Sequence, residues 1–192
     1  MIEEIRSPRL LIRPPKPEDS KQLHEATTRS LKELIKWLPW AKDHSFKKTE
    51  EFIDKSMKKW GSNNQNDFPL IVIHKNSNEI IAASGYNDKS NPSIPYYEIC
   101  YWLDSTHSGK GYATELTNAL TQYAFKKLNA IRVQIRAQIE NKKSIAVAKR
   151  CGYTQEAILK NVARDCITSE PKDEILLSCF STELLPNMKV EF

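Results

Sequence analysis

The sequence predicts a single α/β domain, residues 1–192, built on a mixed sheet with helices on its faces. Three observations support this prediction. Segments with the two-residue period of strands alternate along the chain with segments of helical period. An aromatic segment, Tyr96 to Leu103, leads into a loop with two glycines and then into a long helical pattern. No repeat, low-complexity tract or linker divides the 192 residues, and their 40% hydrophobic content is ordinary for a globular domain.

The N-terminal half is expected to form helices and then three strands. Asp19 or Ser20 can cap the first long helix, since a short side chain with an oxygen satisfies free N–H groups. Apolar residues of a later helix form one stripe that is expected to pack in the core; they are Phe52, Ile53, Met57 and Trp60. The expected elements are a strand at 9–13, a helix at 19–30, another amphipathic turn or two at 31–38, a helix from Ser45 or Thr49 to 60, a polar loop at 61–67, strands at 68–74 and 79–88, a loop at 89–95 and a strand at 96–103.

The C-terminal half continues this alternation. After the glycine loop, apolar residues from Leu116 to Leu128 step by three and four, which predicts a helix with one apolar face. Apolar and polar residues then alternate from Ile131 to Ala137, the pattern of a half-exposed strand. Asn141 is expected to cap the next helix, which ends at Gly152, and a final strand is expected at 175–180.

Composition limits the classes of function. The formal net charge of +5 is modest and spread along the chain, so no nucleic-acid partner is expected. No apolar run approaches the roughly 18 residues of a membrane span, and no signal-peptide pattern is present, so a cytoplasmic protein without a membrane partner is expected. The 4 histidines lack metal-ligand spacing, and the 4 cysteines, of which Cys100 lies in an apolar strand, are expected to be buried free thiols.

The run from His107 to Glu115, His-Ser-Gly-Lys-Gly-Tyr-Ala-Thr-Glu, is typical of a loop that binds a phosphate. Glycines allow close approach of the backbone, and the first free N–H groups of the following helix point at the anion. Lys110 adds a positive charge. An ordinary turn is the alternative, but two of only 5 glycines lie here. The Gly-x-x-x-x-Gly-Lys-Ser/Thr motif of nucleoside-triphosphate loops is absent. The dinucleotide fingerprint Gly-x-Gly-x-x-Gly does not match either, because position 114 is Thr instead of Gly.

Residues 108–113 resemble the Gln/Arg-x-x-Gly-x-Gly/Ala signature of the GNAT superfamily of acyl-CoA N-acetyltransferases, with Ser108 in place of the usual Gln or Arg. Four further segments resemble, in order and spacing, the RimJ/RimL-like branch, which includes enzymes that acetylate ribosomal-protein N-termini. These segments are Ser-Pro-Arg-Leu-Leu-Ile-Arg-Pro at 7–14 with Pro-Glu-Asp at 17–19, Trp-Leu-Pro-Trp at 37–40, Glu-Ile-Cys-Tyr-Trp-Leu-Asp at 98–104, and Asn-x-x-Ser-x-x-Val-Ala-x-x-x-Gly-Tyr at 141–153.

This resemblance implies a GNAT-type fold, a mixed and mostly antiparallel central sheet that is splayed between two strands and flanked by helices. It implies acetyl-CoA as co-substrate in the gap, no metal, and direct transfer of the acetyl group to a primary amine. A peptide or protein N-terminal α-amine is the expected acceptor, and a small amine such as an aminoglycoside or polyamine is the alternative. A non-catalytic acyl-CoA-binding module is a further alternative. The protein could be a monomer or a homodimer.

Two residues are expected to perform proton transfer. Glu98 would deprotonate or orient the amine, because burial of a carboxylate in an apolar strand costs free energy and so indicates a role. A structural ion pair with Arg132 or Arg136 is the alternative. Many GNAT enzymes protonate the departing thiolate from a tyrosine whose position here is Ala148. The resemblance instead points to Ser144, one turn earlier on the same helix face, either as this acid or as a cofactor contact.

The remaining site residues are expected to bind. A backbone N–H of the strand at 100–103 would meet the thioester oxygen. The amide of Asn141 would pair with the pantetheine arm, and Lys149 or Arg150 could reach the phosphates unless that helix face is merely solvated. The residues expected to contact acetyl-CoA are Tyr101, Trp102, Leu103, Ser108, Gly109, Lys110, Gly111, Tyr112, Ala113, Thr114, Asn141 and Lys149. Those expected near the acceptor are Trp37, Trp40 and His107, with core packing as the alternative for the two tryptophans.

Overall fold

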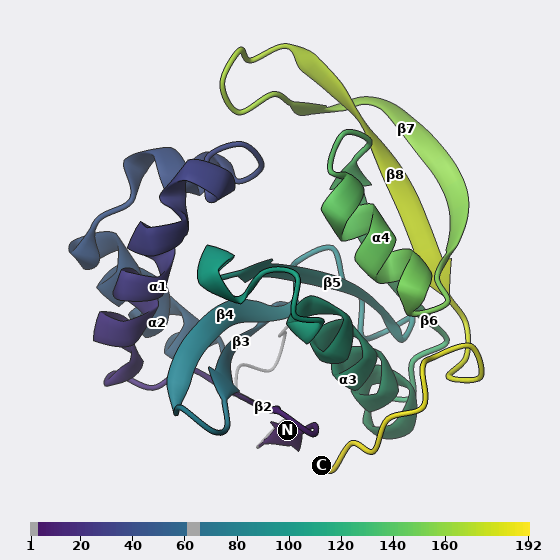
Figure 1. Ribbon diagram of the computed structural model, residues 1–192. Helices are drawn as coiled ribbons and strands as arrows, with labels where there is room; N and C mark the ends of the chain where they lie inside the picture. The colour runs from purple at the N-terminus through teal and green to yellow at the C-terminus, as the bar shows by residue number, and fades with distance from the viewer. Residues whose placement is uncertain (1–3, 61–65) are drawn as a thin grey trace.

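The computed structural model describes residues 4–60 and 66–192, which form one eight-stranded sheet with helices on both faces (Figure 1). The strand order is β1-β2-β3-β4-β5-β6-β8-β7, and every neighbouring pair is antiparallel except β5 and β6. The predicted α/β architecture is therefore confirmed. The elements are β1 (Ile5–Arg6), β2 (Leu10–Arg13), α1 (Asp19–Leu34), η1 (Pro39–Asp43), α2 (Phe46–Lys59), β3 (Phe68–His74), β4 (Glu79–Tyr86), β5 (Tyr96–Leu103), η2 (Ser105–His107), α3 (Tyr112–Lys127), β6 (Arg132–Gln138), α4 (Lys142–Arg150), β7 (Thr154–Arg164) and β8 (Pro171–Cys179).

The sheet buries apolar side chains on both faces. Successive residues of a strand point to opposite faces, so Leu70 and Val72 of β3 join the core beneath α3 and α4. Ile71 and Ile73 join a second cluster, which includes Leu23 of α1. This two-sided burial explains why β3 is a continuous apolar run rather than an alternating one.

β5 and β6 separate after a short region of pairing. Their parallel ladder joins only residues 96–98 to residues 132–134. Beyond these pairs β5 continues along β4, and β6 continues along β8. The sheet therefore divides into two halves, and a gap opens between them.

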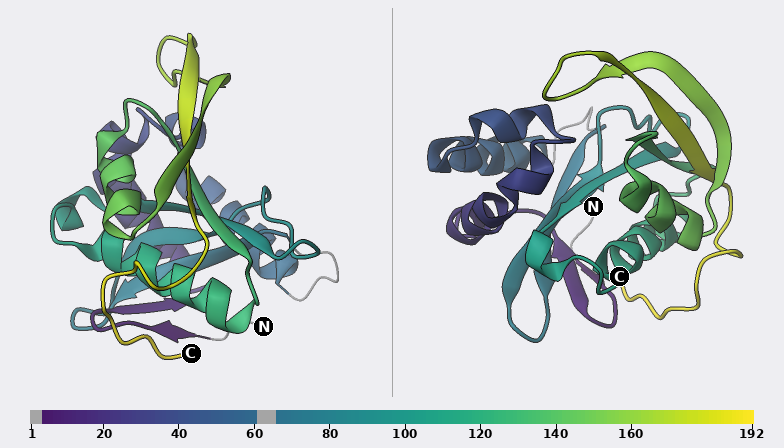
Figure 2. Two further views of the ribbon diagram at one scale, coloured as in Figure 1. Left: turned by 90° about the vertical axis from the view of Figure 1, so that its right-hand side faces the viewer. Right: turned by 45° about the horizontal axis from the view of Figure 1, so that its top comes forward.

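The β7–β8 hairpin curves over the open end of this gap toward the side of α1 and η1 (Figures 1 and 2). Cys166, near the turn of the hairpin, is buried. Burial and Asp165 raise the pKa of this thiol, while the positive charge of Lys42 in η1 lowers it. The hairpin consequently forms a roof over the gap.

Four residues that the sequence patterns place on buried faces are exposed. Phe52 and Met57 are exposed, because α2 buries a narrower stripe whose only large apolar member is Ile53. Ile131 is also exposed, since it precedes β6. Cys100 is exposed because its side chain borders the gap, where β6 has already diverged from β5.

Two of the three helix N-caps predicted from the sequence agree with the structure. Ser45 Oγ accepts a hydrogen bond from the Lys48 N–H, and Asn141 Oδ1 accepts one from the Ser144 N–H, as expected of caps. Asp19, in contrast, pairs with an arginine of β2, and α1 runs unbroken to residue 34. β7 was not predicted from the sequence, and the final strand begins at residue 171 rather than at the predicted 175. The loop expected at 61–67 lies mostly outside the described residues.

Candidate active site

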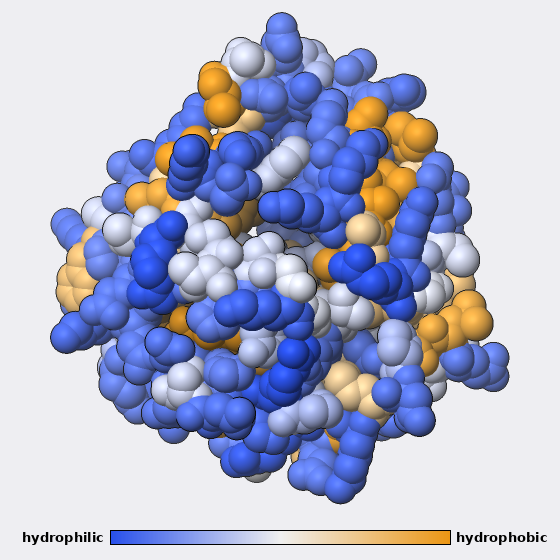
Figure 3. Space-filling model, viewed as in Figure 1, coloured by the Kyte–Doolittle hydropathy of each residue, from blue (hydrophilic) through white to orange (hydrophobic). Residues whose placement is uncertain are grey.

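The gap between β5 and β6 opens into a cleft of about 1100 Å³. The molecular surface is hollowed near the middle of the face shown in Figure 3. Of the residues expected to contact acetyl-CoA, all except Lys110 and Lys149 lie on the wall of this cleft. Its wall is formed by residues 99–103 of β5, 135–138 of β6, parts of 105–114 before and within α3, parts of 141–150 at α4, and parts of 33–38 at the end of α1.

One end of the cleft is formed by the free N-terminus of α3. Gly109 and Gly111 have φ values of +79° and +83°, a left-handed backbone conformation that residues with a Cβ rarely adopt. Gly111 is the N-cap, and no side chain among the described residues caps this helix. The first helical residues, 112–114, line the cleft. The loop can therefore present backbone N–H groups and the positive end of the helix dipole to a phosphate.

The loop is held in place from the N-terminal segment of the chain. The buried carboxylate of Glu115 accepts hydrogen bonds from Ser7 Oγ at 2.7 Å, from the Arg9 N–H at 2.7 Å and from Arg9 Nε at 2.6 Å. Arg9 Nη1 also donates to the carbonyl of Lys110 at 2.9 Å, and the guanidinium lies 4.2 Å from the centre of the Tyr112 ring. Arg9 and Glu115 belong to two different sequence segments, 106 residues apart, and their contact was not predicted.

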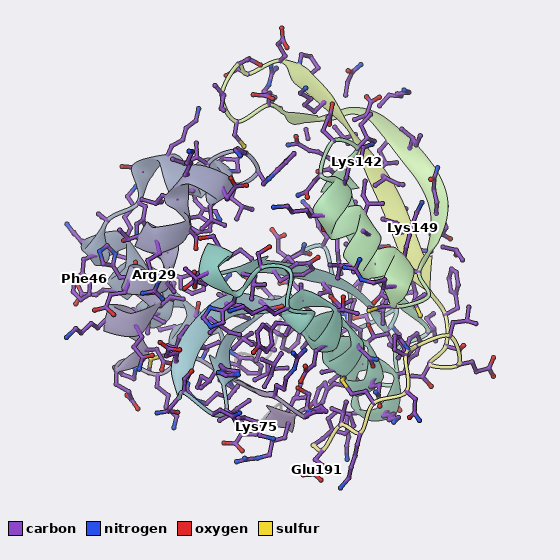
Figure 4. All side chains as sticks on the ribbon, in the orientation of Figure 1. Arg29, Phe46, Lys75, Lys142, Lys149 and Glu191 are labelled. Carbon is purple, nitrogen blue, oxygen red and sulfur yellow. The ribbon has the colours of Figure 1, made fainter. Side chains whose placement is uncertain are left out.

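The basic residues near this end differ from those expected. Lys110 and Lys149 are exposed, and neither side chain lines the cleft. Lys149 lies at the opposite end of α4 from Lys142 (Figure 4). Arg150 does line the cleft, and its Nε donates to Thr114 Oγ1 at 3.2 Å. The placement therefore favours Arg150 over Lys149 as the cation beside the α3 N-terminus.

The middle of the cleft exposes backbone donors of β5. The Asn87 N–H donates to the Glu98 carbonyl at 2.9 Å, so residue 98 and alternate residues after it direct their backbone groups to β4. The N–H groups of Tyr101 and Leu103 point the other way. They lie beyond the last residues of β5 that pair with β6, so they face the gap. The separation of the strands thus supplies free donors, and the β4–β5 register contains no bulge.

Two hydroxyl groups meet across the gap. Tyr101 Oη of β5 lies 3.3 Å from Ser144 Oγ of α4. Burial raises the pKa of Tyr101 to about 12, although the hydrogen bond with Ser144 acts in the opposite direction. The tyrosine is therefore protonated at neutral pH. Asn141 lies beside this pair on the cleft wall, with its side-chain oxygen engaged by the Ser144 N–H.

Glu98 is almost fully buried, and its carboxylate is surrounded by donors. It accepts hydrogen bonds from Asn87 Nδ2 at 2.9 Å and from Gln134 Nε2 at 2.6 Å, and Arg136 Nε lies 3.3 Å from Oε2. Of the two arginines considered from sequence, Arg136 is the partner, and Arg132 pairs with a glutamate of β7. Glu98 borders a second, polar cavity of about 740 Å³ and does not line the larger cleft, whereas Arg136 lines both.

The three residues expected near the acceptor do not come together. Trp37 is half-buried and lines the cleft. Trp40 is exposed, and its ring centre lies 6.4 Å from that of Trp102 rather than on the cleft wall. His107 lies outside the cleft, with its ring centre 5.9 Å from that of Tyr112.

Residues 4–60 and 66–192 contain neither a candidate metal centre nor a candidate membrane span. No group of three or more His, Cys, Asp or Glu side chains in this part of the chain could hold a metal ion. No helix within it is long and apolar enough to cross a membrane.

Residues 9–154 match the model of the acetyltransferase (GNAT) domain family. The chain belongs to this family. As a GNAT protein it is an N-acetyltransferase with acetyl-CoA as its co-substrate, and the residues of the cleft fit that molecule, because an uncapped helix N-terminus lies at one end and free N–H groups lie in the gap.

Other proteins resemble this GNAT chain over different lengths. It is 34% identical over 98 residues to the uncharacterized N-acetyltransferase p20 of Bacillus licheniformis, covering 50% of this chain and 52% of that protein. It is 31% identical over 91 residues to the ribosomal-protein-serine acetyltransferase of Escherichia coli (strain K12), and these residues cover 47% of this chain and 50% of that protein. The chain thus spans about half the length of these two relatives. The structure of RimL, the ribosomal L7/L12 α-N-protein acetyltransferase, in complex with coenzyme A has a TM-score of 0.82 over 94% of this chain and 99% of that chain, with 22% sequence identity, which establishes the common fold.

Proposed function

We propose that the protein transfers the acetyl group of acetyl-CoA to the N-terminal α-amine of a peptide or protein. The observation that carries the proposal is the continuity of the cleft. It runs from the α3 N-terminus, past the Tyr101–Ser144 pair, to a wall that contains Trp37, under the β7–β8 roof. The names of the E. coli relative and of RimL, both ribosomal-protein acetyltransferases, support this acceptor and a cytoplasmic site of action.

The donor end of the cleft would hold acetyl-CoA, which supplies an activated acetyl group. The N–H groups at the start of α3 and the guanidinium of Arg150 would bind its phosphates. Asn141 would pair with the amides of the pantetheine arm. The N–H groups of Tyr101 and Leu103 would donate to the thioester oxygen, where negative charge develops during attack by the amine.

The departing sulfur needs a proton. We assign its delivery to Ser144, which lines the cleft. A serine hydroxyl is a weak acid, but Tyr101 Oη lies within hydrogen-bond distance and can replace the proton that Ser144 gives up. Since burial keeps Tyr101 protonated at neutral pH, the pair provides a short relay.

The acceptor must lose a proton before it attacks. An N-terminal α-amine has a pKa of roughly 7.7–8.0 and is mostly protonated at neutral pH. We assign the proton acceptor to the acidic cluster around Arg136, of which Glu98 is the member indicated by sequence. A carboxylate in this position would also attract the ammonium form of the acceptor.

Mass spectrometry of an acceptor panel tests the function directly. The panel contains peptides with varied N-terminal residues, the same peptides blocked by N-acetylation, polyamines and aminoglycosides, each with the protein and acetyl-CoA. Acetylation of the free peptides alone is the expected result. Modification of only polyamines or aminoglycosides would favour the small-amine alternative. Binding of acetyl-CoA without any acetylated product would favour a non-catalytic module.

A further inference from the structure

We propose that Glu174 of β8 is the carboxylate that receives the acceptor amine and takes its proton, and that Glu98 is a positioning residue that holds Arg136. This inference rests on the proposed acetyl transfer and assigns one of its steps. Nothing in the sequence patterns distinguishes Glu174, which lies in a charged run at the start of the last strand.

The topology of the sheet brings Glu174 to the correct face. Its neighbours Ile175 and Leu177 point into the core beneath α3 and α4, so Glu174 points to the opposite face. β6 lies beside β8 there, and Arg136 Nε is 3.3 Å from Glu98 Oε2 and 3.7 Å from Glu174 Oε2. One guanidinium is thus shared by two carboxylates, which leaves the cluster with one negative charge when both are ionised.

The two carboxylates differ in how many donors they already have. Glu98 accepts from two side-chain amides in addition to its arginine contact. The carboxylate of Glu174 has a single ion-pair partner, Arg136, and it accepts no hydrogen bond from a side chain of the described residues. Its side chain is 20% exposed, against 5% for Glu98. Glu174 therefore keeps lone pairs available for an incoming ammonium group.

The two carboxylates also open onto different cavities. Glu174 lies on the wall of the large cleft, together with Tyr101 and Ser144. Glu98 borders the smaller polar cavity, and Arg136 lies at the boundary between the two. An amine that enters the large cleft to reach the thioester would meet Glu174 and would be separated from Glu98 by the guanidinium.

The electrostatic surroundings make Glu174 a stronger base than an ordinary glutamate. Burial raises its pKa, Arg136 of β6 lowers it, and Glu98 of β5 raises it, with a net increase. On β7 its partner is Leu159, which does not titrate. The other charged groups on this cleft or beside Glu174 are Glu33 of α1, Lys142, Lys143 and Arg150 of α4, the Lys160–Asp173 pair of β7 and β8, and Lys172 of β8 with its partners Glu140 and Asp165.

The proton balance of the step is complete with these groups. The ammonium nitrogen gives one proton to a Glu174 oxygen, which later releases it to solvent. The lone pair of the nitrogen forms the bond to the acetyl carbon as the carbon–sulfur bond breaks. The nitrogen loses a second proton as the amide forms, the sulfur gains one from the Ser144–Tyr101 pair, and the second proton restores that pair through solvent. The net release is one proton per ammonium acetylated.

The test compares Glu174→Gln with wild type in steady-state kinetics from about pH 6 to about pH 9. The variant is expected to lose about 100-fold or more in kcat at neutral pH, the range of a lost general base, with acetyl-CoA affinity unchanged. Its residual kcat/KM should rise about tenfold per pH unit below the pKa of the amine, because only the free neutral amine can then react. Glu170→Gln is the matched control, since it removes an exposed carboxylate from the turn of the same hairpin.

Glu98→Gln gives the decisive contrast. It removes a negative charge that raises the pKa of Glu174, so the acidic limb of the pH profile should move to lower pH but remain present, because Glu174 is intact. Loss of the acidic limb in Glu98→Gln, with a normal profile in Glu174→Gln, would overturn the inference and return the base to Glu98.

A measurement without an acceptor separates this inference from the proposed function. If wild-type protein acetylates nothing on the panel, the proposed function fails, and the inference is judged by carboxyl ¹³C NMR of glutamate-labelled protein. The Glu174 signal, assigned by its absence from Glu174→Gln, should titrate above the usual range of a glutamate, and its titration should move to lower pH in Glu98→Gln. A Glu174 titration identical in wild type and Glu98→Gln would refute the coupling on which the inference depends.

Discussion

Replacement of Gly111 by glutamate is expected to weaken acetyl-CoA binding mainly through charge. A Cβ at this position would meet only Arg9 Nη2, at 3.4 Å, so a side chain can be accommodated. The φ of +83° costs a non-glycine residue roughly 1–2 kcal/mol, and this cost is the same for glutamine and glutamate. A carboxylate about 5 Å from a phosphate charge is repelled by about 3 kcal/mol at an effective dielectric constant of about 20. That repulsion corresponds to roughly a hundredfold increase in Kd.

Calorimetric titration of acetyl-CoA into wild type, Gly111→Gln and Gly111→Glu separates the two effects. The glutamine variant reports strain and volume, and the additional loss in the glutamate variant reports charge. The gap between the variants should narrow as salt rises from about 0.1 M to about 1 M, because the screening length falls from about 10 Å to about 3 Å. Equal affinities for the two variants at low salt would show that no phosphate binds at this helix N-terminus.

Three further outcomes are expected. Ser144→Ala and Tyr101→Phe should each lower kcat by about tenfold or more while acetyl-CoA affinity is retained; rapid-quench kinetics with wild-type rates in both would remove the pair from proton transfer. Glu115→Gln should reduce the free energy of unfolding by about 1–3 kcal/mol in urea titrations, because a buried acceptor loses charge-assisted hydrogen bonds; an unchanged midpoint would contradict this. Burial raises the pKa of Asp104, but hydrogen bonds from Arg29 and the following turn have the larger combined effect. The net pKa is therefore lower than the usual 3.8. The stability difference between wild type and Asp104→Asn should therefore be complete above about pH 4 and shrink as the pH falls through the lowered pKa, whereas a pH-independent difference would argue against the ion pair.

The parts of the fold that were predictable from sequence depend on local rules. The glycine loop predicts the start of α3 because a left-handed residue at Gly111 and a free helix N-terminus are properties of a few consecutive residues. Asn141 predicts the start of α4 for the same reason. β7 escaped prediction because most of its residues are exposed on both faces, so no alternation of apolar and polar side chains marks it.

The parts of the site that were not predictable depend on contacts between distant segments. Arg9 and Glu115 fix the glycine loop before α3 only because β2 passes beside α3. Arg136 joins Glu98 to Glu174 only because β8 returns along β6 after the hairpin. Glu98 stands out in the sequence because its strand is apolar, and Arg136 is one of two arginines that could pair with it, but Arg9, Glu115 and Glu174 have no sequence pattern that marks their contacts.

The proton donor that we propose illustrates how such a contact can replace a missing residue. The helix position at which many GNAT enzymes carry a tyrosine is Ala148, which is fully buried in the core and does not line the cleft. A tyrosine hydroxyl nevertheless reaches the cleft, from Tyr101 on the opposite wall, and meets Ser144 at 3.3 Å. Protonation of a thiolate requires a hydroxyl at a point in space, and α4 and β5 both border that point because β5 and β6 have separated there. Loss of the α4 tyrosine is therefore compatible with catalysis, since the geometry of the gap allows the same group to come from a strand.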